Sequence, residues 1–312
     1  MKKPLFFLLI VFNISNVNAQ YITTPNLDLL VSGEQELAPH AEQIIQGAEA
    51  INRITSDSIF VKNWVKLLKT KNSFYYPFDS LMTISRIYAP DSSFRIFTWQ
   101  LVINDNTVRQ HGAIQMNTSD GSLKLFPLID KSDVIENLSD TITSNLAWVG
   151  AIYYKMIQKD YKKEKYYTLI GYDENNIKST KKIIEVLHFK DGLPVFGGGY
   201  FLIPNDDIKP HNHARYIMEY KKDASPKLNF DAEMNMIVLE HLVSESNQPA
   251  KAWTMVGDGD YDGLKWKSGR WIYVPKIFDQ ITPEGKVPTP MPIRDNKGNI
   301  DDTKLKPIIT PQ

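Results

Sequence analysis

Two histidines one residue apart, in His211-Asn212-His213, form the pattern most typical of a metal site in this chain. Alternate residues of an extended segment lie on one face, so both imidazoles could reach a single ion. A metal-assisted hydrolase needs more ligands, which other histidines could supply (His40, His111, His188 and His241). The alternative is a surface turn that enters a strand, because Pro204 and Pro210 flank the polar run just before these histidines.

A second pattern resembles the first half of a calcium-binding loop. Asp258, Asp260 and Asp262 alternate, and Gly263 stands at the sixth position. Oxygen ligands with this spacing suit a hard cation, but an EF-hand also has a bidentate Glu at position twelve. Gly269 occupies that position, and the residues between have a hairpin pattern. The alternative is a turn in which Asp and Gly bond the local backbone.

The remaining motifs give no coherent catalytic set. Glu185 and His188 stand three apart in an expected strand, so they face opposite sides of it. The glycines at 197–199 do not precede a helix, so they predict a bulge or a crossing of two backbones rather than a phosphate loop. The chain contains neither G-x-S-x-G nor H-E-x-x-H. The sequence identifies no catalytic residue and no cofactor.

The N-terminus has the layout of a secretory signal peptide. Lys2 and Lys3 precede an apolar run, Leu5 to Phe12, and a small-residue site ends at Ala19. This order predicts cleavage after Ala19, so residues 1–19 are a signal peptide and the mature chain begins at Gln20. The run is about half the roughly 20 residues that a membrane span needs. We expect an exported protein, located in the periplasm, at the cell surface or in the medium.

Composition narrows the class of partner. The chain has 312 residues, with 36 basic and 36 acidic side chains, so no global field favours nucleic acid or an anionic membrane. No other segment is apolar enough for a membrane span, which predicts a soluble protein. The absence of cysteine means that an exported fold depends on core burial, without disulfides.

The mature chain begins with a linker, residues 20–33, and a helical hairpin, residues 34–70, packed on the body. Leu37, Ile44 and Ile51 recur at seven-residue spacing, which is typical of one helix face. The segment Thr55-Ser56-Asp57 offers caps for the second helix. That helix would carry an apolar stripe through Phe60 and Trp64.

Residues 71–279 predict an antiparallel β body. Strands with period two are separated by turn residues such as Asp191-Gly192 and Ser268-Gly269. The expected strands are 81–88, 94–103, 108–116, 123–129, 147–157, 165–172, 182–189, 193–203, 215–221, 226–230, 234–243, 263–267 and 270–275. The stretch 147–157 also fits a helix. The fold class is α+β and mostly β: a meander forming a curved sheet, two packed sheets or a barrel. Residues 280–312 predict a Pro-rich, flexible tail.

Several strings in this body are similar to those of a known family. They are Phe94-Arg95-Ile96-Phe97-Thr98-Trp99, His111-Gly112-Ala113-Ile114-Gln115-Met116, Lys124-Leu125-Phe126-Pro127-Leu128, Tyr166-Tyr167-Thr168-Leu169-Ile170-Gly171-Tyr172-Asp173 and Tyr220-Lys221-Lys222-Asp223-Ala224-Ser225. With these strings the chain resembles a family of uncharacterised exported proteins of the Bacteroidetes kind. The resemblance covers most of residues 34–278 and implies no activity and no catalytic residues.

These observations favour a non-enzymatic binding or interaction module of the cell envelope. Its partner could be an envelope protein, a peptide or a glycan. One alternative is a metal-assisted hydrolase that uses His211 and His213. Another is a structural component of the cell surface.

Overall fold

The computed structural model describes residues 21–278 except 105, 206 and 207, and the side chains at 204–211 are outside the description. The predicted signal peptide, 1–19, and the predicted tail, 280–312, lie outside the described residues. Residues up to Lys276 form one unit, and a second begins at Ile277. The helices and sheets of the described residues belong to the first unit.

Two α-helices begin the described chain: α1, Thr24–Gln46, and α2, Ala50–Leu68. The linker predicted at 20–33 is wrong for most of its length, because α1 starts at Thr24 with a proline in its first turn. The prediction of caps at Thr55-Ser56-Asp57 is also wrong. The chain turns earlier, at Gly47, and these three residues lie inside α2. The residues at the start of α1 lack a clear helical period, but burial of Leu30 stabilises the helix there.

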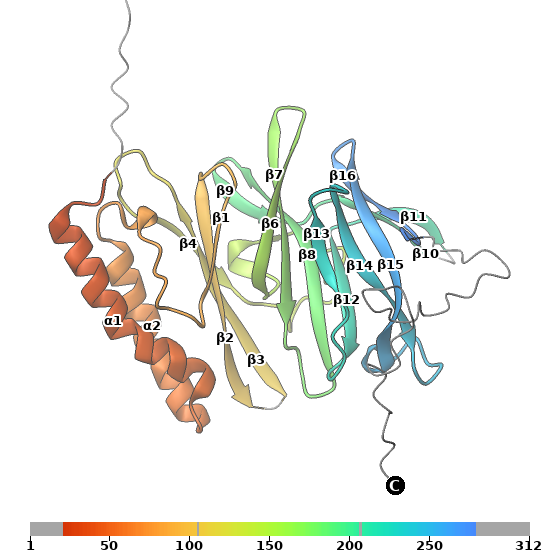
Figure 1. The fold of residues 1–312 in the computed structure, drawn as a ribbon, viewed down its shortest axis with the longest axis horizontal. Coiled ribbons are helices and arrows are strands. Elements are labelled where there is room, and N and C mark those ends of the chain that lie inside the picture. Colours follow the sequence, from red (N-terminus) through yellow and green to blue (C-terminus); the bar gives the residue numbers. More distant parts are fainter. Residues whose placement is uncertain (1–20, 105, 206–207, 279–312) are drawn as a thin grey trace, which may run out of the picture. The chain divides into compact units, whose positions relative to one another are not determined.

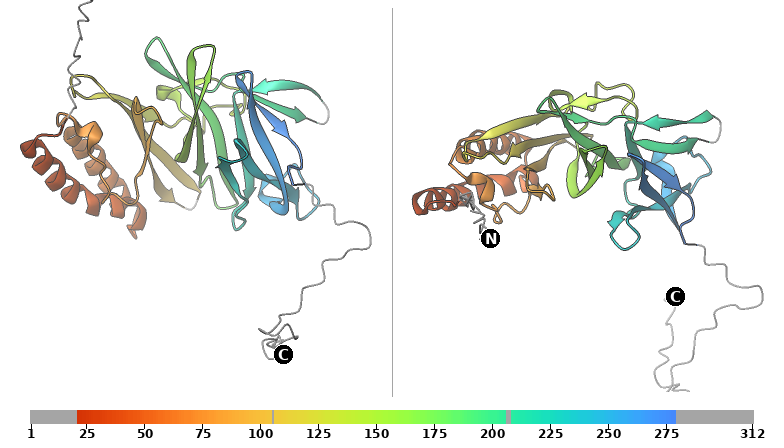
Figure 2. Two further views of the ribbon diagram at one scale, coloured as in Figure 1. Left: turned by 45° about the horizontal axis from the view of Figure 1, so that its top comes forward. Right: turned by 90° about the horizontal axis from the view of Figure 1, so that it is seen from above.

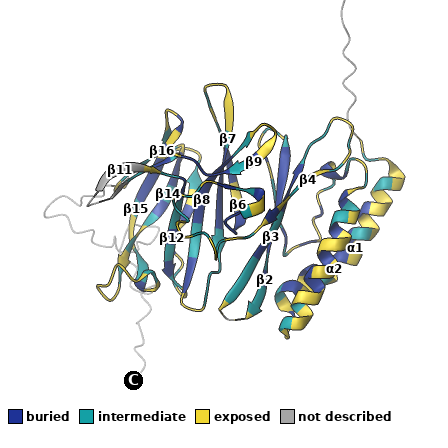
Figure 3. Ribbon diagram, turned by 180° about the vertical axis from the view of Figure 1, so that it is seen from behind, coloured by how far each residue is buried: buried dark blue, intermediate teal, exposed yellow. Residues whose placement is uncertain are grey.

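The helix pair packs on the first sheet through one face of each helix (Figure 3). The buried positions recur at helical spacing, with Leu30, Leu37 and Ile44 on α1, and Phe60 and Trp64 on α2. Trp64 meets Phe97 of the sheet edge to face at 4.9 Å between ring centroids. Each large side chain buried in this way contributes roughly 1.5–3 kcal/mol to folding.

The body is mostly β: of the residues that the structure describes, 46% lie in strands and 20% in helices. The first sheet has the order β1-β2-β3-β4 and the second β5-β9-β8-β7-β6, with β12 added to β8; the third has the order β11-β10-β16-β15-β14-β13. Figures 1 and 2 show them in succession from the helices. The strands are β1 Ser85–Tyr88, β2 Phe94–Asn104, β3 Thr107–Met116, β4 Lys124–Ile129, β5 Thr143–Ser144, β6 Ile152–Tyr161, β7 Glu164–Asp173, β8 Ser179–Lys190, β9 Leu193–Phe196, β10 Phe201–Asn205, β11 Ile208–His213, β12 Arg215–Lys221, β13 Leu228–Asp231, β14 Met236–Ser244, β15 Met255–Lys267 and β16 Arg270–Val274.

The predicted mostly β fold with antiparallel pairing is confirmed, and in the described part of the chain no sheet closes as a barrel. Three pairings depart from a simple meander. Strand β5 pairs with β9, β12 returns to pair with β8, and β10 pairs with β16 in parallel. Between β9 and β10, Gly197 and Gly198 have φ of 87° and 140°, values that glycine adopts readily. These glycines carry the chain from the second sheet to the third.

Three apolar clusters fill the layers. One lies between the helices and the first sheet, and includes Phe60 and Trp99. The next joins the first and second sheets around Phe94 and Trp148, and the last joins the second and third around Trp271. Across the described residues, no helix is both long and apolar enough to span a membrane.

Candidate functional site

The predicted metal pair lies on β11, where His211 and His213 occupy alternate positions opposite Ile203 and Phe201. The side chain of His211 is outside the description. The Nδ1 atom of His213 lies 2.6 Å from Oδ1 of Asp140. Among the side chains that the structure describes, no three of His, Cys, Asp or Glu form a group that could hold a metal ion. Metal binding at this pair stays a prediction.

The calcium-like aspartates all lie within strand β15 rather than in a loop. Asp258 sits opposite an irregularity in β14, where its Oδ2 contacts Nδ1 of His241 at 2.8 Å. Burial raises the pKa of Asp258, but the bond to His241, the bond from the Asp260 amide and the charge of His241 together outweigh it, so the pKa lies below its usual value. Asp262 is buried and accepts hydrogen bonds from the Tyr273 hydroxyl and the Lys276 amide. Asp260 is exposed.

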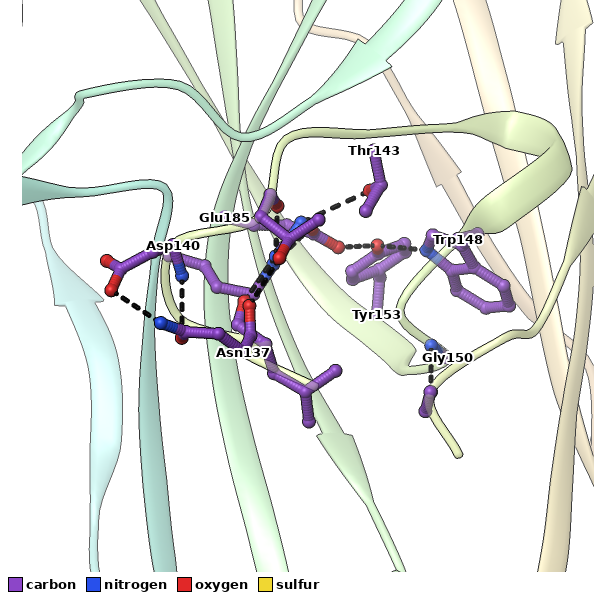
Figure 4. A network of polar contacts seen from close by, with 11 residues as sticks. Asn137, Asp140, Thr143, Trp148, Gly150, Tyr153 and Glu185 are labelled. Atoms are coloured by element: carbon purple, nitrogen blue, oxygen red, sulfur yellow. Dashed lines mark hydrogen bonds and ion pairs between the residues drawn. The ribbon is translucent and has the colours of Figure 1, made fainter. Parts of the chain in front are cut away.

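A buried ionic network lies in the second sheet (Figure 4). Arg215 and Glu185 are register partners on β12 and β8, and both side chains are 0% exposed. Nε of Arg215 donates to Glu185 at 3.1 Å, and the other guanidinium nitrogens donate to Thr143 Oγ1 and to two carbonyls of the loop before β5. Tyr153 donates to the second oxygen of Glu185. Burial and the Glu185 charge raise the pKa of Tyr153.

This network has a structural role, because it joins the loop before β5 to the core. Trp148 Nε1 donates to the Tyr153 hydroxyl at 2.7 Å, so the chain of bonds runs from the loop to the core between two sheets (Figure 4). Every nitrogen of Arg215 has an acceptor, which a buried charge requires. Glu185 is therefore committed to Arg215 rather than to His188, as their placement three apart on the strand predicts. The network offers no unused group for chemistry.

A cleft of about 420 Å³ lies between α2 and the first sheet. One helix face contributes Asp57, Ser58, Val61 and Lys62, at the i, i+1, i+4 and i+5 spacing that places side chains together. The sheet contributes neighbouring positions of three strands, because Trp99 pairs with His111 and His111 pairs with Ile129. Gly112, Pro127 and Leu128 complete the lining. Most of the cleft wall is thus aliphatic or aromatic.

The polar centre of the cleft is a hydrogen-bonded trio. Asp57 is 6% exposed, and its Oδ1 accepts from Trp99 Nε1 at 2.8 Å. The same oxygen lies 3.0 Å from Nδ1 of His111. The rings of Trp99 and His111 meet edge to face at 5.7 Å between centroids. These contacts fix the orientation of the imidazole from two sides, so that His111 lies at a defined place in the cleft.

The protonation of the His111 ring follows from its partner. A carboxylate can only accept hydrogen bonds, so the Nδ1 atom that faces Asp57 carries a proton. The other ring nitrogen, Nε2, makes no hydrogen bond to any described residue. A ligand in the cleft can therefore bond to Nε2, which accepts when the ring is neutral and donates when it is protonated.

A second cleft, of about 360 Å³, is mainly polar and lies where β3 and β4 meet β7 and β8. Its charged groups bond one another, as Arg109 does with Asp133 at 2.9 Å. Asp173 accepts from the side-chain amide of Gln110. Burial raises the pKa of Asp173. Since these groups already satisfy each other, the apolar cleft beside His111 is the stronger candidate.

Sequence reasoning did not find this site, although one signal points to it. Asp57 stands three residues before Phe60 and seven before Trp64, so it belongs to the buried stripe of α2. A charged residue in an apolar stripe needs a buried partner. The identity of that partner depends on the packing of α2 against β2 and β3, which local spacing does not reveal. No family model, curated protein or solved structure matches this chain.

Proposed function

We propose that this chain is an exported, non-enzymatic binding module of the cell envelope, and that it takes a small, mainly apolar ligand in the cleft between α2 and the first sheet. The observation that carries the proposal is the lining of the cleft, where aliphatic and aromatic walls surround Asp57 and His111. Small-molecule sites commonly have this form: concave, mostly apolar, with a few converging polar groups.

The position of Ser58 supports binding rather than covalent catalysis. It is the hydroxyl residue in the lining, and its Oγ donates to the carbonyl of Ile54 at 3.0 Å. A nucleophilic hydroxyl needs a base within hydrogen-bond reach, as serine hydrolases provide with histidine. The Ser58 hydrogen is directed to its own helix instead. The dyad of Asp57 and His111 is then suited to recognise a ligand.

The test is binding of a neutral fluorescent probe, 1-aminoanthracene, to the purified mature chain. Val61 lines the cleft and is 37% exposed, so Val61→Glu places a charge in the apolar wall. Val31 on α1 is 38% exposed and does not line the cleft, which makes Val31→Glu the matched control. We expect saturable binding that Val61→Glu weakens at least about tenfold and Val31→Glu leaves intact. Equal binding by both variants, or none by the unmodified chain, contradicts the proposal.

A further inference from the structure

We infer that the cleft recognises the carboxylic acid group of its ligand, with His111 and Lys62 as the recognising side chains. The inference rests on the proposed function, because it names the chemistry of the ligand that the cleft takes. It begins from the arrangement of three charged or titratable groups in a mainly apolar lining: Asp57, Lys62 and His111.

His111 is suited to a carboxylic acid in both of its states. Asp57 occupies Nδ1, so Nε2 is the atom that faces a ligand without a competing bond from the described residues. A neutral ring accepts the acid's proton at Nε2, and a protonated ring donates to the carboxylate. These two states are the same complex, with the proton either on the ligand's acid group or on the Nε2 atom of the ring. Charge-assisted bonds of this kind are roughly twice as strong as neutral ones.

Lys62 supplies the second contribution. It is exposed on α2 beside Val61, and no described residue forms a hydrogen bond or ion pair with it. The Asp57 carboxylate, the acid of the lining, already accepts from Trp99 and lies against His111. The charge without a partner in the lining is therefore the ammonium of Lys62. It attracts an anionic head group and repels a cationic one.

Charge balance in the lining is compatible with a carboxylic acid and disfavours a cationic ligand. With a neutral imidazole, the Asp57 and Lys62 charges cancel. A carboxylate bound beside an imidazolium also leaves the lining neutral; the ring receives its proton from the acid form of the ligand or, when the ligand binds as the carboxylate, from solvent. A bound ammonium ligand leaves one positive charge in an apolar cleft, which is costly. The remaining lining, with Val61, Pro127 and Ile129, suits an apolar tail.

Three ligands with the same tail separate the head groups: octanoate, 1-octanol and octylammonium, each used to displace 1-aminoanthracene from the full mature chain. We expect octanoate to bind about tenfold more tightly than 1-octanol, and octylammonium to bind most weakly. This comparison needs no variant. Equal affinities for octanoate and 1-octanol overturn the inference.

Variants test the two residues separately. His111→Asn keeps a donor for Asp57 and removes Nε2, so we expect octanoate affinity to fall about tenfold and 1-octanol affinity, which loses only a neutral hydrogen bond, to fall less. Lys62→Met keeps the aliphatic stem, and we expect a loss of roughly two- to fivefold for octanoate. Lys66→Met, one turn further along α2 and outside the cleft lining, is the control. Loss of 1-octanol binding equal to that of octanoate in both variants contradicts the head-group roles.

The failure of the inference is distinguishable from that of the proposed function. If Val61→Glu abolishes binding of all three ligands equally and they bind alike, the cleft is a binding site but carboxylate recognition is wrong. If 1-aminoanthracene binding is absent from the unmodified chain, or is unaffected by Val61→Glu, the cleft is not the ligand site and both conclusions fall. Circular dichroism of each variant confirms that the fold is retained.

Discussion

The buried pair of Arg215 and Glu185 gives the largest stability effect that we expect from a single substitution. In Arg215→Met, the Glu185 carboxylate keeps Tyr153 as a donor but loses its cation, in a place with no exposed surface. The carbonyl of Thr141 also loses a donor at 2.7 Å. Removal of one partner from a buried pair costs roughly 3–5 kcal/mol, and we expect about 4 kcal/mol here. This is a large part of the roughly 5–15 kcal/mol that keeps a domain folded.

Urea unfolding followed by tryptophan fluorescence measures this effect, because the indole of Trp148 belongs to the network. The midpoint should fall by more than about 1 M, since unfolding free energies change by roughly 1–3 kcal/mol per molar urea. Arg109→Met is the matched control, since its ion pair with Asp133 is 37% and 53% exposed. It should cost less than about 1 kcal/mol.

The double variant Arg215→Met with Glu185→Leu distinguishes the charge from the packing. It removes the unpaired carboxylate, so about half of the lost stability should return. If Arg215→Met costs no more than Arg109→Met, the pair does not hold the loop before β5 in the way that its bonds indicate. If the double variant is less stable than Arg215→Met alone, the unpaired charge is not the cause of the loss.

Three further outcomes are expected. Burial raises the pKa of Asp91, but bonds from Lys165, Ser93 and Tyr167 outweigh it and lower the pKa to about 2, so its stabilisation is present above about pH 4 and is lost as the pH falls towards 2. Asp91→Asn should therefore flatten the dependence of the urea midpoint on pH in this window, and an unchanged slope would refute the assignment. The intact mass of the exported chain should correspond to a start at Gln20, and a start at Met1 contradicts the signal peptide. If His211 and His213 form a metal site, zinc titration should show one bound ion that His213→Ala loses, and absence of binding by the unmodified chain excludes that alternative.

Local signals in the sequence were sufficient for the turns and for many of the strands, but not for β5, β11 or the first part of β15. Asp191 and Gly192 have φ of 52° and 75°, and Ser268 and Gly269 have φ of 51° and 81°, as tight hairpins need. Alternation of side chains located most strands to within a few residues. The ambiguous stretch at 147–157 becomes a strand from Ile152, because β6 pairs with β7.

Features that depend on contacts distant in sequence could not be predicted in the same way. The helical start at Thr24 depends on burial of Leu30 against other elements. The role of Asp57 depends on Trp99 and His111, which reach it only after α2 has packed on the sheet. Asp is a common helix cap, which is why a cap was predicted at Asp57. In the folded chain its carboxylate bonds instead to tertiary partners from within α2.

The route of the chain between the second and third sheets has a consequence for assembly. After Gly197 the backbone leaves for β10 and β11, and then comes back so that β12 can complete the edge of β8. One edge of strand β10 pairs with β16, the last strand of the described chain, so that edge stays unpaired until β16 is in place. Neither sheet can therefore be finished before the other has begun, and closing such distant pairs is slow. A chain cut anywhere between β9 and β16 leaves unpaired strand edges, so we expect these two sheets to complete their pairing together, as one cooperative unit.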